Sequence, residues 1–292
     1  MATFDSWESY FYAETYNPIT QDGTLRNLYG ERDAATLHDL EYGAADRRSV
    51  ELRLGIADVP RTYDAEHIRA IHGYLFQDVY EWAGQFRTVD MGKAWPPELG
   101  RGFTEFLAPE RIGSYLDDVQ QRVAAVPWAE LDRDQFGHAA ADIFSRCNFA
   151  HSAHEGNGRT VKLFMQHVAE LSRFELDYNP QRSGITPEVW NRASVLTSPD
   201  PGTDRPVPGE MVPVFRALAV DRSAGLKGTQ QGPAARTLRD ESRGRVSDLI
   251  DEKVEELRRA SFPTAPTPGL EHSTEARRST PPMQDRYRGR GR

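Results

Sequence analysis

The stretch His151-Ser152-Ala153-His154-Glu155-Gly156-Asn157-Gly158-Arg159-Thr160-Val161-Lys162 decides how this chain is interpreted. Before it, apolar residues recur at helical spacing over residues 132–149, and after it the same period restarts at Val161. The sequence therefore predicts the end of one helix, a tight loop and the start of a second helix.

The composition of this loop favours a ligand held through its phosphates. The first N–H groups of a helix lack intrahelical partners, and the helix dipole favours an anion at that end. Gly156 and Gly158 would let the backbone approach a phosphate chain closely. Arg159 could grip the outer phosphate oxygens, and Lys162 would add a point charge one turn later.

Two more side chains of the stretch supply the chemistry of a transfer reaction. Glu155 is a hard oxygen ligand suited to a Mg²⁺ ion shared with phosphates. His151 carries an imidazole that can take a proton from an incoming nucleophile near neutral pH. Together these residues predict a nucleotide and Mg²⁺ site with its own general base.

The same stretch resembles the signature of Fic (Fido-fold) proteins, whose pattern is His-Pro-Phe-x-Asp/Glu-Gly-Asn-Gly-Arg-x-x-Arg. Most members of that family transfer AMP from ATP to a protein hydroxyl. The resemblance therefore implies a Mg²⁺-dependent protein adenylyltransferase that modifies Ser, Thr or Tyr and releases pyrophosphate. The residues that match the pattern are His151, Glu155, Gly156, Asn157, Gly158 and Arg159.

The resemblance also implies a role for each matching residue. His151 is expected to be the general base, with Asn157 beside it in the catalytic site. Glu155 would hold Mg²⁺, and the residues expected to bind ATP are Gly156, Asn157, Gly158, Arg159 and Lys162.

Three positions depart from the family pattern: Ser152 replaces Pro, Ala153 replaces Phe, and Lys162 replaces the final Arg. These departures motivate an alternative function, in which a degenerate Fic domain binds a nucleotide or a partner without turnover. A third interpretation takes His151, His154 and Glu155 as a zinc hydrolase site. Outside that interpretation, His154 is expected to face solvent.

A second stretch, residues 72–84, is also similar to a recurrent Fic segment, and His72 within it is expected to be a structural histidine. Residues 86–91 alternate like a strand, and residues 92–102 supply turn residues. In Fic proteins a β-hairpin flap lies here over the active site, although the residues alone fit an ordinary surface hairpin equally well. By resemblance the edge that docks the target comprises Thr88, Val89, Asp90, Met91, Gly92 and Lys93.

Apolar periodicity predicts most of the remaining chain to be helical, and the flap is the only strand signal. The fold class is therefore all-α, a Fic-type helical bundle with a small β-hairpin flap over the active site. Asp33 and Asp64 are expected to begin two of the helices. Outside the signature, the expected helices cover residues 33–54, 64–84, 105–126, 132–149, 187–196 and 208–220.

Composition divides the chain into three parts. Residues 1–32 are rich in aromatic and turn residues and are expected to form an N-terminal strap over the core. Residues 33–221 would be the Fic-like catalytic domain. Residues 222–292 are expected to be a largely disordered basic tail, with a short amphipathic helix near residues 246–259.

Charge and cysteine content narrow the class of protein. The net charge is −8, but residues 222–292 carry 15 Lys and Arg against 10 Asp and Glu, so the acidic residues concentrate in the body. An acidic body argues against a specific nucleic-acid binder. The single Cys147 excludes an internal disulfide and suits the cytosol. No signal peptide or membrane span is apparent, so a cytoplasmic location is expected, with delivery into another cell left open.

The expected partners are a target protein that presents a hydroxyl side chain and a small antitoxin-like inhibitor chain. Many Fic proteins instead carry an inhibitory Ser/Thr-x-x-x-Glu-Gly/Asn helix. Residues 237–242 come close to that pattern, but they end in Ser242, and Glu241 would have to pair with Lys162 rather than with Arg. A separate inhibitor chain, as in toxin–antitoxin systems, is therefore favoured.

Overall fold

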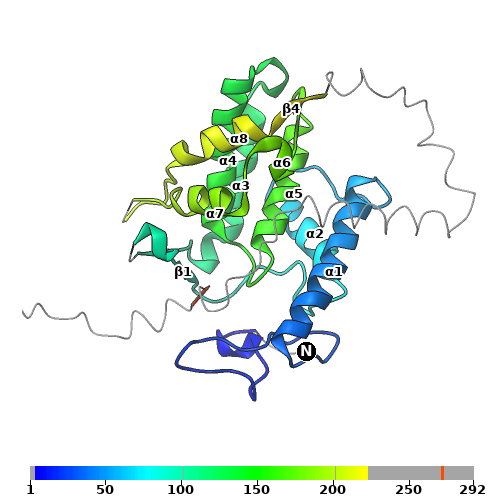
Figure 1. The fold of residues 1–292 in the computed structure, drawn as a ribbon, viewed down its shortest axis with the longest axis vertical. Coiled ribbons are helices and arrows are strands. Elements are labelled where there is room, and N and C mark those ends of the chain that lie inside the picture. Colours follow the sequence, from blue (N-terminus) through cyan, green and yellow to red (C-terminus); the bar gives the residue numbers. More distant parts are fainter. Residues whose placement is uncertain (1–3, 101, 201, 223–270, 273–292) are drawn as a thin grey trace, which may run out of the picture.

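The computed structural model describes residues 4–100, 102–200, 202–222 and 271–272 (Figure 1). Within these ranges the chain is mostly helical, with two small antiparallel sheets, which confirms the expected helical fold with a hairpin. Among the described helices, none is both long and apolar enough to cross a membrane. The tail helix expected near residues 246–259 and the candidate inhibitory element at 237–242 lie outside the described residues.

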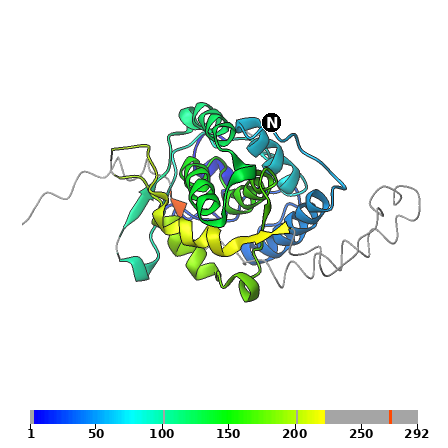
Figure 2. The same ribbon diagram turned by 90° about the horizontal axis from the view of Figure 1, so that it is seen from above.

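Two helices in the middle of the molecule carry the signature loop between them. They are α4 (Arg133–Ala150) and α5 (Asn157–Ala169). Seen from above, they stand side by side with the other helices around them (Figure 2). The helix α4 packs against α3 (Ile112–Ala125), α5 and α8 (Met211–Leu218), and α5 also packs against α2 (Ala65–Phe76).

Aspartates begin three of the helices, and the sequence predicts this for Asp33 and Asp64. The side chain of Asp33 accepts a hydrogen bond from the backbone of Thr36 and begins α1 (Ala34–Arg53). Asp64 begins α2 in the same way, and Asp132 begins α4 in a reciprocal capping box with Gln135.

Three expected helices are shorter in the structure than the apolar period suggested. The one expected over residues 208–220 covers only Met211–Leu218, between a 3₁₀ turn and the strand β4 (Ala219–Asp221). The helix α2 ends at Phe76, and a series of turns carries the chain to Gly84, whose φ is +77°. The expected helix over residues 105–126 begins only at Ile112, because β2 (Phe103–Glu105) pairs with a neighbouring strand and a 3₁₀ turn follows it. Two short helices, α6 (Pro180–Ser183) and α7 (Pro187–Val195), complete the bundle.

The flap is a three-stranded sheet. Its central strand β1 (Gly92–Ala94) pairs antiparallel with β2 on one edge and with β5 (Glu271–His272) on the other. The strand expected at residues 86–91 is wrong, because these residues form no strand and the hairpin begins only at Gly92. A second sheet, which the sequence did not predict, pairs β3 (Phe174–Leu176) with β4 (Ala219–Asp221).

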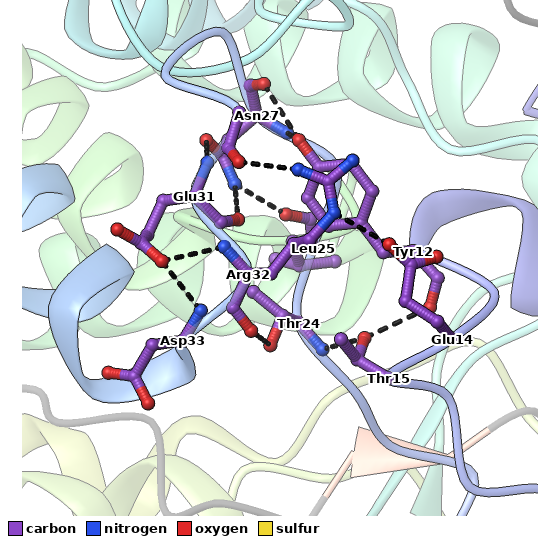
Figure 3. A network of polar contacts seen from close by, with 10 residues as sticks. Tyr12, Glu14, Thr15, Thr24, Leu25, Asn27, Glu31, Arg32 and Asp33 are labelled. Carbon is purple, nitrogen blue, oxygen red and sulfur yellow. Dashed lines mark hydrogen bonds and ion pairs between the residues drawn. The ribbon is translucent and has the colours of Figure 1, made fainter.

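The N-terminal segment is fixed to the bundle by buried aromatic side chains and by its own polar contacts. Trp7, Tyr10 and Phe11 are all buried in the core. Further along the segment, the Asn27 side chain donates to the carbonyl oxygen of Glu31 and accepts from its N–H, which closes the turn that leads into α1 (Figure 3).

Candidate active site

The signature forms the predicted helix–loop–helix connection. The helix α4 ends at Ala150, and His151 turns the chain in the left-handed region with φ +39° and ψ +60°. Gly156, with φ +81°, is the N-cap of α5. A Cβ atom at this glycine would lie 2.3 Å from the ring of Phe76, so only glycine fits where the loop crosses that ring.

The His151 side chain lies against the flap. Its imidazole stacks on the ring of Phe106, with 3.7 Å between ring centroids and 1° between the planes. Phe106 directly follows β2, and its N–H donates to the carbonyl oxygen of Met91. The flap and the proposed general base are therefore in direct contact.

Arg87 binds the C-terminal end of α4 to the segments on either side of the flap. This guanidinium is 2% exposed and donates to carbonyl oxygens at both places. Nε contacts His151 O at 2.8 Å and Nη1 contacts Val89 O at 2.7 Å, while Nη2 contacts the carbonyls of Leu107 and Ala150. Carbonyl dipoles at a helix C-terminus favour a cation. The carbonyl oxygens therefore take the place of water around the buried guanidinium and fix its position.

The middle of the loop is closed by Asn157. Its Oδ1 accepts from the N–H of Ala153 at 2.8 Å, and its Nδ2 donates to the carbonyl of the same residue at 2.7 Å. The side chain thus pairs with both polar groups of one loop residue. In this structure the amide of Asn157 shapes the loop.

His72 supports the loop from below and is the structural histidine that the sequence predicts. Its Nδ1 accepts from the N–H of Gly84 at 2.8 Å, and its Nε2 lies 3.0 Å from the carbonyl oxygen of Glu155. Since Nδ1 is an acceptor, Nε2 must carry the proton and donate. Burial lowers the pKa of His72 to about 4, so the ring stays neutral in this position at neutral pH.

The expectation that His154 faces solvent is wrong. His154 is 4% exposed. Its ring stacks on Tyr10 at 3.9 Å between centroids and lies tilted against Trp7 at 4.5 Å. The aromatic N-terminal segment covers the loop, and the imidazole of His154 packs among its rings, Trp7 and Tyr10. His151 and His154 therefore lie against different groups, and no cluster of three or more His, Cys, Asp or Glu among the described residues could hold a metal ion.

Arg159 is held by a carboxylate from a distant helix. Its Nη2 donates to Oε1 of Glu41 in α1 and lies 3.5 Å from Oε1 of Glu155. The other oxygen of Glu41 accepts from the hydroxyl of Tyr80. Nη1 of Arg159 is buried and has no hydrogen-bond partner among the residues that the structure describes. A buried donor of this kind is costly unless a ligand satisfies it.

The N-terminus of α5 presents further donors beside Arg159. Gly156 has no side chain that could cap the first turn, and Gly158 in that turn is exposed. The Glu155 side chain is 22% exposed and accepts from the N–H of Gly156 at 2.7 Å. The loop therefore combines helix N–H groups, one guanidinium and one carboxylate within six residues.

Lys162 lies in an aromatic environment. It is 9% exposed, and its Nζ lies 5.1 Å from the ring centroid of Trp190 and 5.8 Å from that of Tyr178. Burial lowers the pKa of Lys162 to about 7, and the charges of Arg53 and Arg159 act in the same direction. Such a lysine is a weaker cation at neutral pH than the arginine of the family pattern.

Of the six residues expected to dock a target, two lie in strand β1, Gly92 and Lys93. Thr88 is exposed, but its hydroxyl donates to the carbonyl of Phe4. The side chains of Val89 and Met91 are buried in the core, and Asp90 between them is half-buried.

The family model described as Fic/DOC matches residues 62–169, which run from α2 to the end of α5. A probable protein adenylyltransferase of Sinorhizobium fredii is 32% identical over 170 residues, an alignment that covers 57% of this chain and 82% of that protein. This chain belongs to the Fic/DOC family. The protein adenylyltransferase VbhT of Bartonella schoenbuchensis is also 32% identical, over 171 residues and 58% of this chain.

Solved Fic domains share the fold. The Fic domain of a Bartonella quintana effector, solved with bound ADP, has a TM-score of 0.60 and 26% identity over 75% of this chain and 98% of that one. BepC of Bartonella tribocorum, solved with bound AMPPNP, has a TM-score of 0.58 and 23% identity over 74% of this chain and 98% of that one. The chain spans about a third of the length of the two Bartonella adenylyltransferases that it matches, 34% and 32%.

Two residues of this Fic/DOC site were missed from the sequence, Glu41 and Arg87. The sequence contained a signal for both, because each is a charged residue at a position whose neighbours on the same face are apolar. In α1 the buried residues Leu37, Glu41 and Ala45 are four positions apart. In the alternating segment before β1, Arg87 falls on the same buried face as Val89 and Met91.

Proposed function

We propose that this Fic/DOC protein transfers AMP from ATP to a hydroxyl side chain of a target protein and releases pyrophosphate. Its relatives in Sinorhizobium and Bartonella are named protein adenylyltransferases. Fic domains of the same fold from two Bartonella species were solved with ADP and with an ATP analogue.

The observation that carries the proposal is the unsatisfied Nη1 donor of Arg159 beside the N-terminus of α5. Phosphate oxygens would satisfy this donor and the N–H groups of the first helical turn together. Gly158 leaves room for that approach because it is exposed and carries no side chain. The α- and β-phosphates of ATP would then lie along the loop, next to His151.

His151 would act as the general base. The hydroxyl oxygen of the target attacks the α-phosphorus, and the bond from that phosphorus to the oxygen bridging to the β-phosphate breaks. The hydroxyl proton passes to the imidazole, and pyrophosphate leaves. Arg87 and Phe106 would hold the imidazole in place for this step, through the backbone and through the ring respectively. Catalysis of this kind depends on positioning and on charge neutralisation.

Glu155 would hold Mg²⁺ together with the nucleotide phosphates. The residue fits this role because its carboxylate is partly exposed and adjoins the N-terminus of α5. Since no cluster of three or more acidic, His or Cys side chains among the described residues could bind a metal, the ion would take most of its oxygen ligands from phosphate and water. When bound, Mg²⁺ would neutralise charge that develops on the pyrophosphate.

The experiment that tests this function compares two labels. Purified protein is incubated with a cell lysate and ATP labelled either at the α-phosphate or at the γ-phosphate. We expect a lysate protein to become labelled from α-labelled ATP only, and the modified residue to be Ser, Thr or Tyr by mass spectrometry. Label transferred from the γ-phosphate would mean that the protein phosphorylates its target, and label from neither would mean no transfer.

The alternative is a nucleotide-binding module without turnover, and Lys162 is the residue that favours it. Its amine lies over aromatic rings with its pKa lowered to about 7, so it offers the outer phosphates less charge than arginine would. Titration with ATP by calorimetry separates the two functions. Tight binding together with no transfer to any lysate protein would favour the module.

A further inference from the structure

The guanidinium of Arg159 lies over two aromatic rings. Its Cζ atom is 4.5 Å from the ring centroid of Tyr42 in α1 and 4.7 Å from that of Phe76, the last residue of α2. The negative face of an aromatic ring attracts a cation, and a planar guanidinium stacks well on such a face. Contact with two rings restricts rotation about the bonds of the arginine side chain. The rings therefore fix the plane in which the terminal nitrogens of Arg159 lie.

A carboxylate fixes the direction of one of these nitrogens. Nη2 of Arg159 donates to Oε1 of Glu41, and the other oxygen of Glu41 accepts from the hydroxyl of Tyr80. Because the second oxygen already has a donor, the guanidinium pairs with Glu41 through one nitrogen and not as a fork. This arrangement leaves Nη1, a buried donor for which the residues that the structure describes provide no partner.

The two rings differ in what else they support. Phe76 is 0% exposed, and a Cβ atom at Gly156 would lie 2.3 Å from its ring, so Phe76 supports the loop as well as Arg159. Tyr42 is half-buried and stacks on His38, one turn earlier in α1, at 4.2 Å between centroids. Tyr42 is therefore the ring that can be replaced without opening the core beneath the loop.

We propose that Tyr42 is a positioning residue for Arg159, whose ring keeps Nη1 available to the outer phosphates of ATP. The inference rests on the nucleotide site of the function proposed above. Without the ring, the guanidinium can turn about its side-chain bonds and present Nη1 to Glu41 as well. A donor that is bound to Glu41 is lost to the phosphates. Tyr42 thus favours nucleotides that carry β- and γ-phosphates over AMP.

The preference among nucleotides provides the main test. Tyr42→Leu removes the ring but keeps an apolar side chain. We expect the Kd for ATP, measured by calorimetry, to rise about fivefold, because one cation–π contact no longer holds Arg159. The Kd for AMP, measured by ligand-detected NMR, should stay within about twofold of the wild type. Equal losses for ATP and AMP would mean that Tyr42 only supports the fold, and they would overturn the proposal.

A conservative variant separates the ring from the hydroxyl. Tyr42→Phe keeps the aromatic face and removes the oxygen, so it should bind ATP within about twofold of the wild type. A loss as large as that of Tyr42→Leu would overturn the role of the ring.

Tyr74 in α2 is a matched control. Its ring centroid lies 5.3 Å from Cζ of Arg48, whose guanidinium pairs with Glu51 and Asp78. Tyr74→Leu therefore removes the same kind of contact from a different arginine, and we expect no change in the Kd for ATP. An equal rise in both leucine variants would mean that loosening of α1 and α2 is the cause, which would overturn the proposal.

A double-mutant cycle tests whether Tyr42 acts through Arg159. Once Arg159→Gln has removed the guanidinium, the ring has no cation left to hold. The Tyr42→Leu/Arg159→Gln variant should therefore bind ATP within about twofold of Arg159→Gln alone. A further rise of about fivefold in the double variant would overturn the proposal.

The inference and the proposed function fail in different ways. If the wild type binds ATP and Tyr42→Leu binds it equally well, the positioning role is wrong and the transferase function stands. If the wild type binds ATP in the predicted pattern but labels no protein, the transferase function fails and the positioning role stands. If the wild type does not bind ATP, both fail.

Discussion

The Nε atom of Arg87 donates a 2.8 Å hydrogen bond to the carbonyl oxygen of His151. His151 lies in the left-handed region with φ +39°, a conformation that costs energy for a residue with a side chain. The same guanidinium also holds the carbonyl of Ala150 and two carbonyls next to the flap. One buried cation therefore fixes both the backbone of the proposed base and the flap that its ring contacts.

Replacing Arg87 should destabilise the protein and slow transfer together. Arg87→Gln would leave several buried carbonyl oxygens without a donor, and we expect the free energy of unfolding to fall by about 3 kcal/mol. Urea unfolding followed by circular dichroism measures this loss. Under conditions where the variant remains folded, the rate of label transfer should fall by a larger factor than the affinity for ATP. The reason is that the imidazole of His151 is no longer held in position.

Arg69 is a suitable control for Arg87. It also donates to a backbone carbonyl, that of Gly84, but its side chain is 43% exposed. Arg69→Gln should therefore change the free energy of unfolding by less than about 1 kcal/mol. Equal losses for the two variants would contradict the role assigned to Arg87.

Glu41 should weaken nucleotide binding in the wild-type protein. Its carboxylate binds Nη2 of Arg159, so its negative charge opposes the phosphates that the neighbouring Nη1 is proposed to hold. Glu41→Gln keeps the shape and an acceptor oxygen but removes the negative charge. We expect the Kd for ATP, measured by calorimetry, to fall about tenfold, or about 1.4 kcal/mol.

Glu51→Gln on the same helix provides the comparison, because Glu51 pairs with Arg48 and Tyr74 instead. This variant should leave the Kd for ATP unchanged. If Glu41→Gln bound ATP more weakly than the wild type, Glu41 would be presenting Arg159 to the nucleotide rather than competing for it.

Lys162 gives a prediction about pH. Burial lowers its pKa to about 7 from 10.5, so the unfolded chain binds more protons between these two values. The cost of burying the charged amine is therefore fully present below pH 7 and disappears as the pH rises toward 10.5. Lys162→Met should raise the free energy of unfolding at pH 6, with a smaller gain at pH 9, as measured in urea.

Lys162→Arg keeps the positive charge at both pH values and should give no gain at either. A gain from Lys162→Met that is the same at pH 6 and pH 9 would show that packing, and not charge, limits the stability at this position.

Local signals in the sequence predict much of this fold. Asp33, Asp64 and Asp132 begin their helices through contacts with residues three positions later, so their effect is visible in a short window. The signature loop was predictable for the same reason. Its glycines and the helical periods on either side of it are contiguous in the chain.

Contacts between distant segments were not predictable in this way. The strands β3 and β4 have three residues each and are stabilised by pairing across more than forty residues, so neither shows a period of its own. His154 is buried only because Tyr10 and Trp7 arrive from the N-terminal segment. Glu41 meets Arg159 from 118 positions away, and only the packing of α1 brings the two together.

If His151 takes the proton of the attacking hydroxyl, the His151→Ala variant should lose transfer but still bind the nucleotide. The rate of label transfer from α-labelled ATP and the Kd for ATP are measured on the same purified variant. We expect transfer to fall by about 10²- to 10⁴-fold while the Kd stays within about threefold of the wild type. Transfer within tenfold of the wild-type rate would contradict this role of His151.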